Sequence, residues 1–208
     1  MKRIFLYILL CFATSAVLYF AISSSYKAYN TVPDNLEMGE RVEQALQFVK
    51  RKGLSTNYAI FVDYSIPSGT PRLFVWDFKA NKVAASTYVM HGSGGSNTEK
   101  MPVFSNKVGS NCSSLGRFEV HKDRHGAKLN RSFRMSGFDK TNSNACGRGI
   151  MLHRSKWVDL WSWKKYIPLH TESCQGCITV GSKGMSYLER LIKKEKKNIL
   201  LWTYYSKS

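Results

Sequence analysis

The stretch Tyr58-Ala59-Ile60-Phe61-Val62-Asp63-Tyr64 decides the fold class, because it is rich in β-branched and aromatic residues and ends in turn signals. A turn at residues 66–71 follows it, and Arg72–Phe78 repeats the pattern. Ala80-Asn81 then leads into a third apolar run, Val83 to His91. Runs of this kind joined by short turns predict a β-meander.

The residues on either side of the meander predict a mixed set of elements. Residues 36–52 carry apolar side chains at helical spacing, which predicts an amphipathic helix that ends at Gly53. Residues 92–114 are rich in Gly, Ser and Asn and predict a long loop. Further elements are expected as strands near 115–120, 132–137, 149–153, 177–181 and 198–205, a partly helical segment at 154–172 and a helix near 184–195. The fold class is therefore mostly β (β+α), a mostly antiparallel sandwich or barrel with peripheral helices.

The N-terminal segment is unlike the rest of the chain. Residues 4–22 carry no charge and follow Lys2 and Arg3, which is typical of an export signal or a membrane anchor. We therefore expect residues 1–23 to be a signal peptide or anchor and residues 24–35 a linker. Residues 36–208 are then enough for one folded domain.

The chain is strongly basic, with a formal net charge of +17. A charge of this size favours anionic partners, and for an exported bacterial protein these are wall polymers and lipid head groups. The sequence has no nucleic-acid-binding motif, so nucleic acid is not an expected partner. The expected location is the periplasm or the wall side of the inner membrane.

Cys177 and His153 each lie at the edge of an apolar run, where a strand would meet a loop. A thiol near an imidazole can lose its proton and become a strong nucleophile. If Cys177 has this role it must be free. The pairing of the other cysteines stays open, with Cys112 and Cys146 as the simplest bridge.

The stretch from Asp63 to Val180 resembles the murein L,D-transpeptidase catalytic-domain family, a divergent YkuD-like branch. The matching pieces, in order, are Asp63–Ser68 with Arg72-Leu73, His91–Gly94, Phe104–Asn106, Gly109-Ser110, Ser113–Gly116, Gly126, Ser136–Asp139, Asn142–Ala145, Arg148–His153 and Gly176-Cys177. The resemblance implies a β-rich L,D-transpeptidase catalytic domain in residues 36–208, with a cysteine nucleophile and peptidoglycan stem peptides as substrate. No cofactor is expected.

The resemblance also assigns roles to residues. Cys177 would attack a stem-peptide carbonyl, with His153 as the base for the thiol and later the acid for the leaving amine. An imidazolium beside the thiol would lower its pKa. The backbone N–H groups of Gly176 and Cys177 are candidates for the oxyanion hole. An amine acceptor would make the protein a transpeptidase, and water would make it an L,D-carboxypeptidase.

The chain departs from the family pattern around the site, which puts substrate preference in question more than reaction type. Cys174 stands where the family often has Ser, and Arg154 where a small residue is usual. Arg154, His91 and Arg148 are candidates for substrate binding. A structural role for His91 and a pairing of Arg148 with Asp139 are the open alternatives.

Other functions compete with this one. Cys174-Gln175-Gly176-Cys177 is a C-x-x-C motif, so a thiol oxidoreductase is a rival function. A related hypothesis keeps the transpeptidase and makes Cys174 a candidate redox partner, whose disulfide with Cys177 would inactivate the nucleophile. Zinc bound by Cys174, Cys177, His153 and His170 would need a non-standard spacing, so no metal is expected. A non-catalytic wall-binding module is the last rival. Trp157, Trp161 and Trp163 favour core packing or a lid over stacking on glycan.

Overall fold

A computed structural model describes residues 39–124, 132–170 and 174–206 of the chain. The signal or anchor expected at residues 1–23 and the linker expected at 24–35 lie outside the described residues. Among the residues that are described, no helix is long and apolar enough to cross a bilayer.

The first described elements confirm the predicted helix and meander. Helix α2 (Gly39–Lys52) buries Ala45, Phe48 and Val49, and Gly53 follows it at a φ of +69°, a left-handed conformation that glycine adopts at little cost. The antiparallel strands after it are β1 (Tyr58–Asp63), β2 (Leu73–Asp77) and β3 (Lys82–Thr87).

The remaining elements fall close to the predicted positions. They are β4 (Val89–Met90), β5 (Gly116–Arg124), β6 (Ser132–Gly137), β7 (Met151–Arg154), α3 (Lys156–Trp161), β8 (Ile178–Val180), α4 (Ser182–Lys194) and β9 (Ile199–Tyr204). All the strands join one sheet in the order β3-β2-β1-β9-β5-β6-β7-β8-β4.

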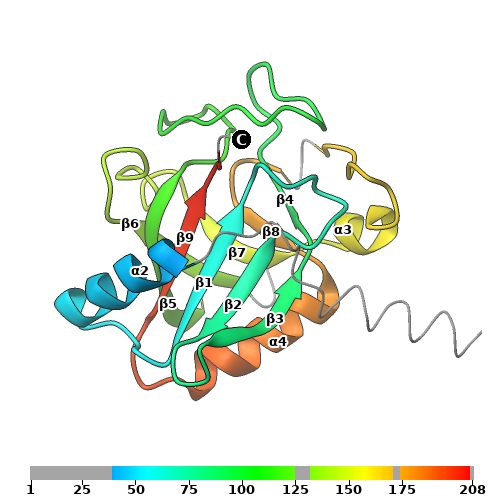
Figure 1. Cartoon of the computed structure of the whole chain (residues 1–208). Helices are drawn as coiled ribbons and strands as arrows, with labels where there is room; N and C mark the ends of the chain where they lie inside the picture. Colours follow the sequence, from blue (N-terminus) through cyan, green and yellow to red (C-terminus); the bar gives the residue numbers. More distant parts are fainter. Residues whose placement is uncertain (1–38, 125–131, 171–173, 207–208) are drawn as a thin grey trace, which may run out of the picture.

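The two edges of this sheet belong to consecutive strands. Only Tyr88 separates the end of β3 from the start of β4, yet the two strands stand at opposite ends of the strand order. The sheet must therefore curl until its edges meet, and the fold is a nearly closed barrel, in which the chain passes directly from β3 to β4 (Figure 1). The prediction of a single strand from Val83 to His91 is wrong. The apolar run is continuous in the sequence, but its first part pairs with β2 and its second part pairs with β8.

Most neighbouring strands are antiparallel, as predicted, but β1 pairs with β9 and β7 pairs with β8 in parallel. A parallel pair needs a crossover connection. The segment between β7 and β8, which contains α3, is such a crossover, and it separates His153 from Cys177 in the sequence. The parallel pairing brings these two regions back together.

Two layers of apolar packing hold the barrel. One face of the strands packs with α4 in the main core, whose largest members include Phe118 and Phe133. The other face of β1, β2 and β9 packs against α2, where Phe48 meets Phe138 at a ring-centroid distance of 5.2 Å. Each fully buried side chain of this size stabilises the fold by about 1.5–3 kcal/mol. In Figure 1 the two helices accordingly lie on different sides of the sheet.

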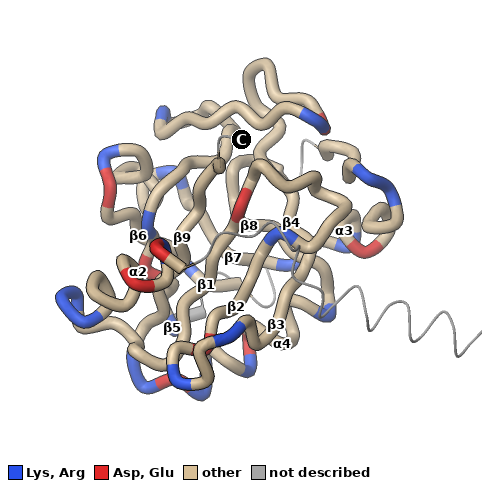
Figure 2. The backbone as a smooth tube through the Cα atoms, viewed as in Figure 1, with Lys and Arg blue, Asp and Glu red and all other residues tan. Residues whose placement is uncertain are grey.

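The charge is spread over the surface. Figure 2 shows Lys and Arg on helices, turns and loops all around the domain, whereas Asp and Glu are few. This agrees with a formal net charge of +17 that no single face carries alone.

Candidate active site

The parallel pairing of β7 and β8 brings the segment that starts at Cys177 alongside the strand that carries His153. Thr179 is the register partner of His153, and Ile178 is the partner of Leu152. Cys177 immediately precedes β8. Because side chains two residues apart on a strand point to the same face, Cys177 and Thr179 lie on the side where His153 reaches Thr179.

The hydrogen bonds of His153 define its tautomer. Its Nδ1 lies 3.1 Å from the carbonyl oxygen of Arg154, which can only accept, so Nδ1 carries the proton. Nε2 is then an acceptor, and the Thr179 hydroxyl donates to it at 3.3 Å. Burial lowers the pKa of His153, so the ring is neutral at pH 7. A neutral imidazole whose Nε2 carries no proton is suited to act as a general base once the Thr179 hydroxyl releases that nitrogen.

The thiol of Cys177 is half-buried, and its Sγ lies 3.9 Å from the carbonyl oxygen of Gly149. Burial raises the pKa of the thiol, while a backbone hydrogen bond with Met151 and the positive charge of Arg148 act in the opposite direction. Burial thus favours a thiol at Cys177 and a neutral ring at His153, whereas the resemblance implies an imidazolium beside the thiol.

Gly176 makes the turn before the nucleophile possible. Its φ is +94°, and an added Cβ would lie 2.4 Å from the carbonyl oxygen of Cys112 and 2.8 Å from Nη2 of Arg148. Only a residue without a side chain fits there. The loop that carries Cys112 therefore lies directly against the backbone of the nucleophile segment.

Arg148 holds that loop in place. Its guanidinium donates to the carbonyl oxygens of Ser105 (2.8 Å) and Cys112 (2.5 Å) and to the hydroxyl of Ser114 (2.5 Å). The predicted pairing of Arg148 with Asp139 is wrong, because Asp139 pairs with Arg117. Arg148 thus belongs to the framework of the site, and its donors are directed at the loop.

His91 also occupies a structural position. It is 1% exposed, its Nδ1 accepts from Nη2 of Arg72 at 3.1 Å, and its Nε2 donates to the carbonyl oxygen of Thr98 at 2.9 Å. Arg72 is itself 2% exposed and donates to Val89 and Ile66 carbonyls. With both ring nitrogens engaged, His91 has no polar atom left for a substrate. Of the substrate-binding candidates, Arg154 alone keeps an exposed side chain.

The other cysteines in the described ranges are free thiols, so the simplest predicted bridge, Cys112 with Cys146, is wrong. Cys174 is buried against Met90, with 3.9 Å between the two sulfur atoms, and burial raises its pKa to about 11. A thiol oxidoreductase would place its C-x-x-C at the start of a helix, but here Cys177 precedes a strand. In the described part of the chain, no group of His, Cys, Asp and Glu side chains is placed to hold a metal ion.

Sequence reasoning assigned no role to Thr179 or Arg72. Thr179 could have been found from the alternation of side chains along the strand after Cys177. Arg72 is among the residues that carry the family resemblance, but a lone arginine in an apolar run does not show which carbonyl groups it will meet.

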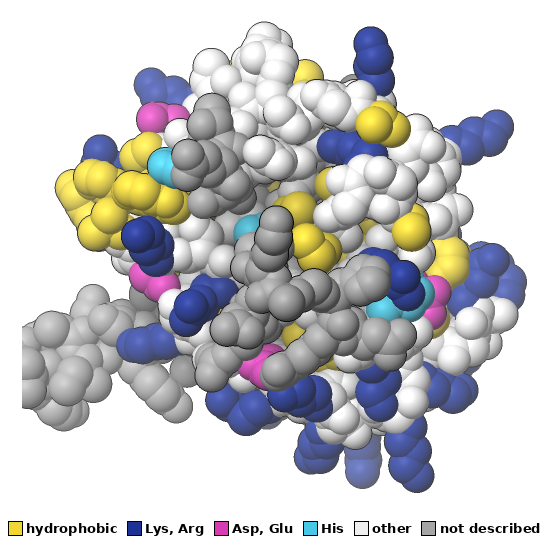
Figure 3. Space-filling model, turned by 180° about the vertical axis from the view of Figure 1, so that it is seen from behind, with side chains coloured by type: hydrophobic (Ala, Val, Ile, Leu, Met, Phe, Trp, Pro, Cys, Tyr) yellow, Lys and Arg dark blue, Asp and Glu magenta, His cyan; other side chains and the backbone are white. Residues whose placement is uncertain are grey.

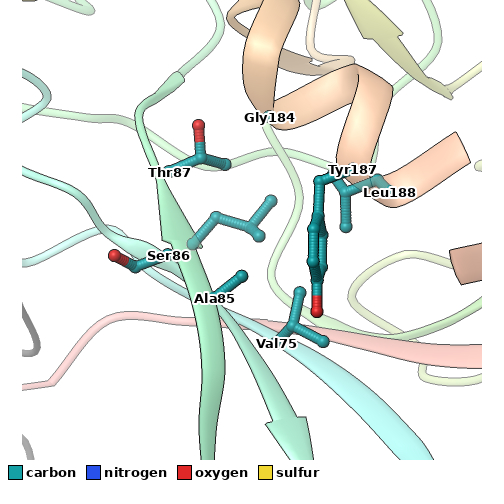
Figure 4. Close-up of a pocket in the computed structure, with 8 residues that line it drawn as sticks. Val75, Ala85, Ser86, Thr87, Gly184, Tyr187 and Leu188 are labelled. Atoms are coloured by element: carbon teal, nitrogen blue, oxygen red, sulfur yellow. The ribbon is translucent and has the colours of Figure 1, made fainter. Parts of the chain in front are cut away.

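A small pocket lies away from this site, between β2, β3 and α4 (Figure 4). Its lining includes Leu73, Val75, Gly184 and Tyr187, and its volume of about 10 Å³ suffices for roughly one water molecule. It is a packing gap and offers no room for a peptide.

The chain matches the L,D-transpeptidase catalytic domain family, YkuD_2, over residues 35–204. Since the match covers most of the sequence, the chain belongs to this family, whose members act on peptidoglycan stem peptides. No curated protein matches it.

Solved structures that resemble the chain include the helical cell shape determining protein Pgp2 from Campylobacter jejuni, at a TM-score of 0.45 and 11% identity, covering 80% of this chain and 56% of that one. An L,D-transpeptidase from Xylanimonas cellulosilytica gives a TM-score of 0.38 and 14% identity, covering 76% of this chain and 68% of that one. The chain thus spans little more than half the length of Pgp2.

Proposed function

We propose that this protein is an L,D-transpeptidase that transfers acyl groups of peptidoglycan stem peptides through a thioester on Cys177. The observation that supports the proposal is the β7–β8 pairing, which brings the segment that starts at Cys177 alongside the strand of His153, whose Nε2 carries no proton. Membership in the L,D-transpeptidase family supports the same reaction.

The first step forms the thioester. Nε2 of His153 takes the thiol proton as Sγ attacks the stem-peptide carbonyl carbon, and the peptide C–N bond then breaks. The departing amine of the terminal D-amino acid takes the proton from His153. No hydrogen bond joins the two side chains among the described residues, so a rotation of the thiol toward Nε2 precedes the step, as is common before substrate binds.

The second step regenerates the enzyme. An amine on a second stem attacks the thioester carbonyl, the C–S bond breaks, and Sγ recovers a proton. Attack by water in place of the amine would make the protein an L,D-carboxypeptidase. The N–H groups of Gly176 and Cys177 are the proposed donors to the oxyanion in both steps.

The decisive experiment is incubation of the full-length protein with disaccharide tetrapeptides under reducing conditions, followed by mass spectrometry. A cross-linked dimer identifies a transpeptidase, and a tripeptide alone identifies a carboxypeptidase. Unchanged substrate would contradict both and favour a non-catalytic wall-binding module.

Two cysteine variants make the experiment specific. Cys177→Ala should abolish product, whereas Cys174→Ser should keep it, because the proposed chemistry needs one thiol. Loss of product in both variants would instead favour chemistry that uses the cysteine pair.

We further propose that the protein works on the wall side of the inner membrane, held or exported by residues 1–23. The support is the uncharged stretch 4–22 behind Lys2 and Arg3. Fractionation of cells that produce the full chain tests this proposal, and recovery of the protein in the cytosol would contradict it.

A further inference from the structure

A cluster of aromatic side chains is exposed on the crossover between β7 and β8. Trp163 is 75% exposed and Leu160 53% exposed, and Trp161 lies beside Trp163 at a ring-centroid distance of 6.0 Å. We call Leu160, Trp161 and Trp163 the aromatic patch. In Figure 3, seen from behind, hydrophobic side chains gather at the edge of the molecule where α3 lies, next to basic side chains.

The expectation of core packing or a lid is met only in part. Trp157 and Trp161 pack against a small core of Met90, Val158, Ile167 and Cys174, but the Trp163 ring is exposed to solvent. A single exposed apolar side chain is ordinary, but neighbouring apolar side chains such as Leu160, Trp161 and Trp163 form a candidate binding surface.

The patch is held rigidly. The indole N–H of Trp163 donates to the carbonyl oxygen of Leu160 at 3.0 Å, so the ring presents only apolar surface outward. The backbone below is fixed because Gly69 donates to the carbonyl oxygen of Lys165 at 3.0 Å and Ile167 donates to the hydroxyl of Ser68 at 2.7 Å. A ligand that stacks on Trp163 would therefore not have to order the loop first.

Positive charge surrounds the patch. The segment from Arg154 to Tyr166 carries Lys156, Lys164 and Lys165 besides Arg154, and its single carboxylate is Asp159. Asp159 accepts from the backbone N–H and hydroxyl of Ser182 at the start of α4, so its charge is engaged there. Nζ of Lys164 lies 4.7 Å from the Trp161 ring centroid and 5.6 Å from that of Trp163.

We infer that the aromatic patch binds the glycan strand of peptidoglycan beside the catalytic site, an inference that rests on the proposed function. The apolar C–H face of a pyranose ring stacks well on an indole, and the lysines suit the carboxylates of stem peptides attached to the strand.

The position of the patch fits this partner. β7 runs from His153 directly into α3, and the small core beneath the patch contains Cys174, three positions before the nucleophile. The crossover that carries the patch thus begins after His153 and ends at Cys177, and for this reason the inference assigns the strand a place beside the catalytic site.

A lipid surface is the competing partner, and the observations favour it less. Helix α3 has only six residues, and Leu160 and Trp163 are the only large apolar side chains of the patch that are strongly exposed. Binding to a bilayer scales with buried apolar area, of which the patch offers little.

The test measures binding of the full-length Cys177→Ala protein to soluble glycan strands from which an amidase has removed the peptides. Trp163→Ala should weaken binding by about 10-fold, which corresponds to about 1.4 kcal/mol. Trp163→Phe should retain most of the affinity because a ring remains. Lys196→Gln, an exposed charge on the segment after α4, is the matched surface control and should leave affinity unchanged.

Three results would overturn the inference: no binding of peptide-free glycan, equal binding by Trp163→Ala, or a loss by Trp163→Ala seen only with anionic phospholipid vesicles. Failure of the proposed function is a separate result, because transfer between short free stem peptides uses Cys177 and His153 but not the aromatic patch, and it should survive Trp163→Ala. Since Trp163 is exposed, its replacement should not prevent folding, and thermal unfolding checks this.

Discussion

The reactivity of Cys177 depends on its thiol pKa, which burial raises and a nearby positive charge lowers. Burial keeps the thiol protonated, and Arg148 is the cation that acts against burial. Arg148→Gln should therefore raise the pKa of Cys177 further and shift its pH profile of alkylation by iodoacetamide upward. Rates measured with Cys11 and Cys146 both replaced by Ser report Cys177, because Cys112 and Cys174 are buried.

Arg154→Gln is the control for this prediction. Its side chain is exposed, and its contact with His153 is made by the backbone carbonyl, so the alkylation profile should not move. An equal shift in both variants would show that overall charge, and not the position of Arg148, sets the thiol pKa.

His91 gives a pH dependence to stability. Burial and the neighbouring Arg72 lower its pKa from 6.5 to about 4, so the unfolded chain binds the proton first as pH falls. The free energy of unfolding should lose up to ~3 kcal/mol from this group between pH 6.5 and 4. His91→Gln, whose amide can both accept and donate, should keep the neutral-pH stability and lose this part of the slope in urea titrations. If the free energy of unfolding of both proteins fell equally with pH, the assignment of this pH dependence to His91 would be wrong.

Cys177 and His153 could be chosen as candidate catalytic residues from the sequence, but the effect of burial on their pKa values could not be predicted. Cys177 and His153 stood out by their places at the ends of apolar runs and by the family resemblance. The neutral state of both depends on burial, which arises from contacts between distant segments. For the same reason, the sequence alone could not distinguish a structural role from a substrate-binding role for His91 and Arg148.

Among the elements, the turn before β8 controls the geometry of the nucleophile. Gly176→Ala would place a Cβ 2.4 Å from the carbonyl oxygen of Cys112 at a φ of +94°. We expect a loss of about 1–3 kcal/mol in stability and a fall of roughly 100-fold in transfer rate, because the nucleophile is displaced. Chemical denaturation and the muropeptide assay measure the two effects.

Gly147→Ala is the matched control. Its added Cβ would find its nearest neighbour, the carbonyl oxygen of Asn144, at 3.8 Å, and no left-handed φ is involved. Both quantities should stay close to those of the unchanged protein. If Gly176→Ala behaved as this control does, the turn would not constrain the site.

The order of the elements was visible in the sequence because turn residues separate apolar runs of clear period. The neighbours of each strand were not visible. Val83 to His91 reads as one run, yet it supplies both edges of the sheet, and the parallel pairing of β7 with β8 depends on a crossover whose path the sequence does not encode locally.

At the scale of the whole molecule, the charge of +17 should dominate weak binding to the wall. Retention on isolated sacculi should fall steeply between about 0.05 and 0.5 M salt, because screening shortens the range of the field. Co-sedimentation of Cys177→Ala measures this without turnover. Salt-independent retention would point to contacts of another kind.

The single residue that joins β3 to β4 has a mechanical consequence. β4 pairs with β8, and β8 begins directly after Cys177. The place where the β3 and β4 edges of the sheet meet is therefore one strand away from Cys177. A flexible insertion beside Tyr88 would loosen the connection between β3 and β4 and weaken the pairing of β4 with β8. The one-residue connection therefore helps to hold the strand that follows Cys177 in position.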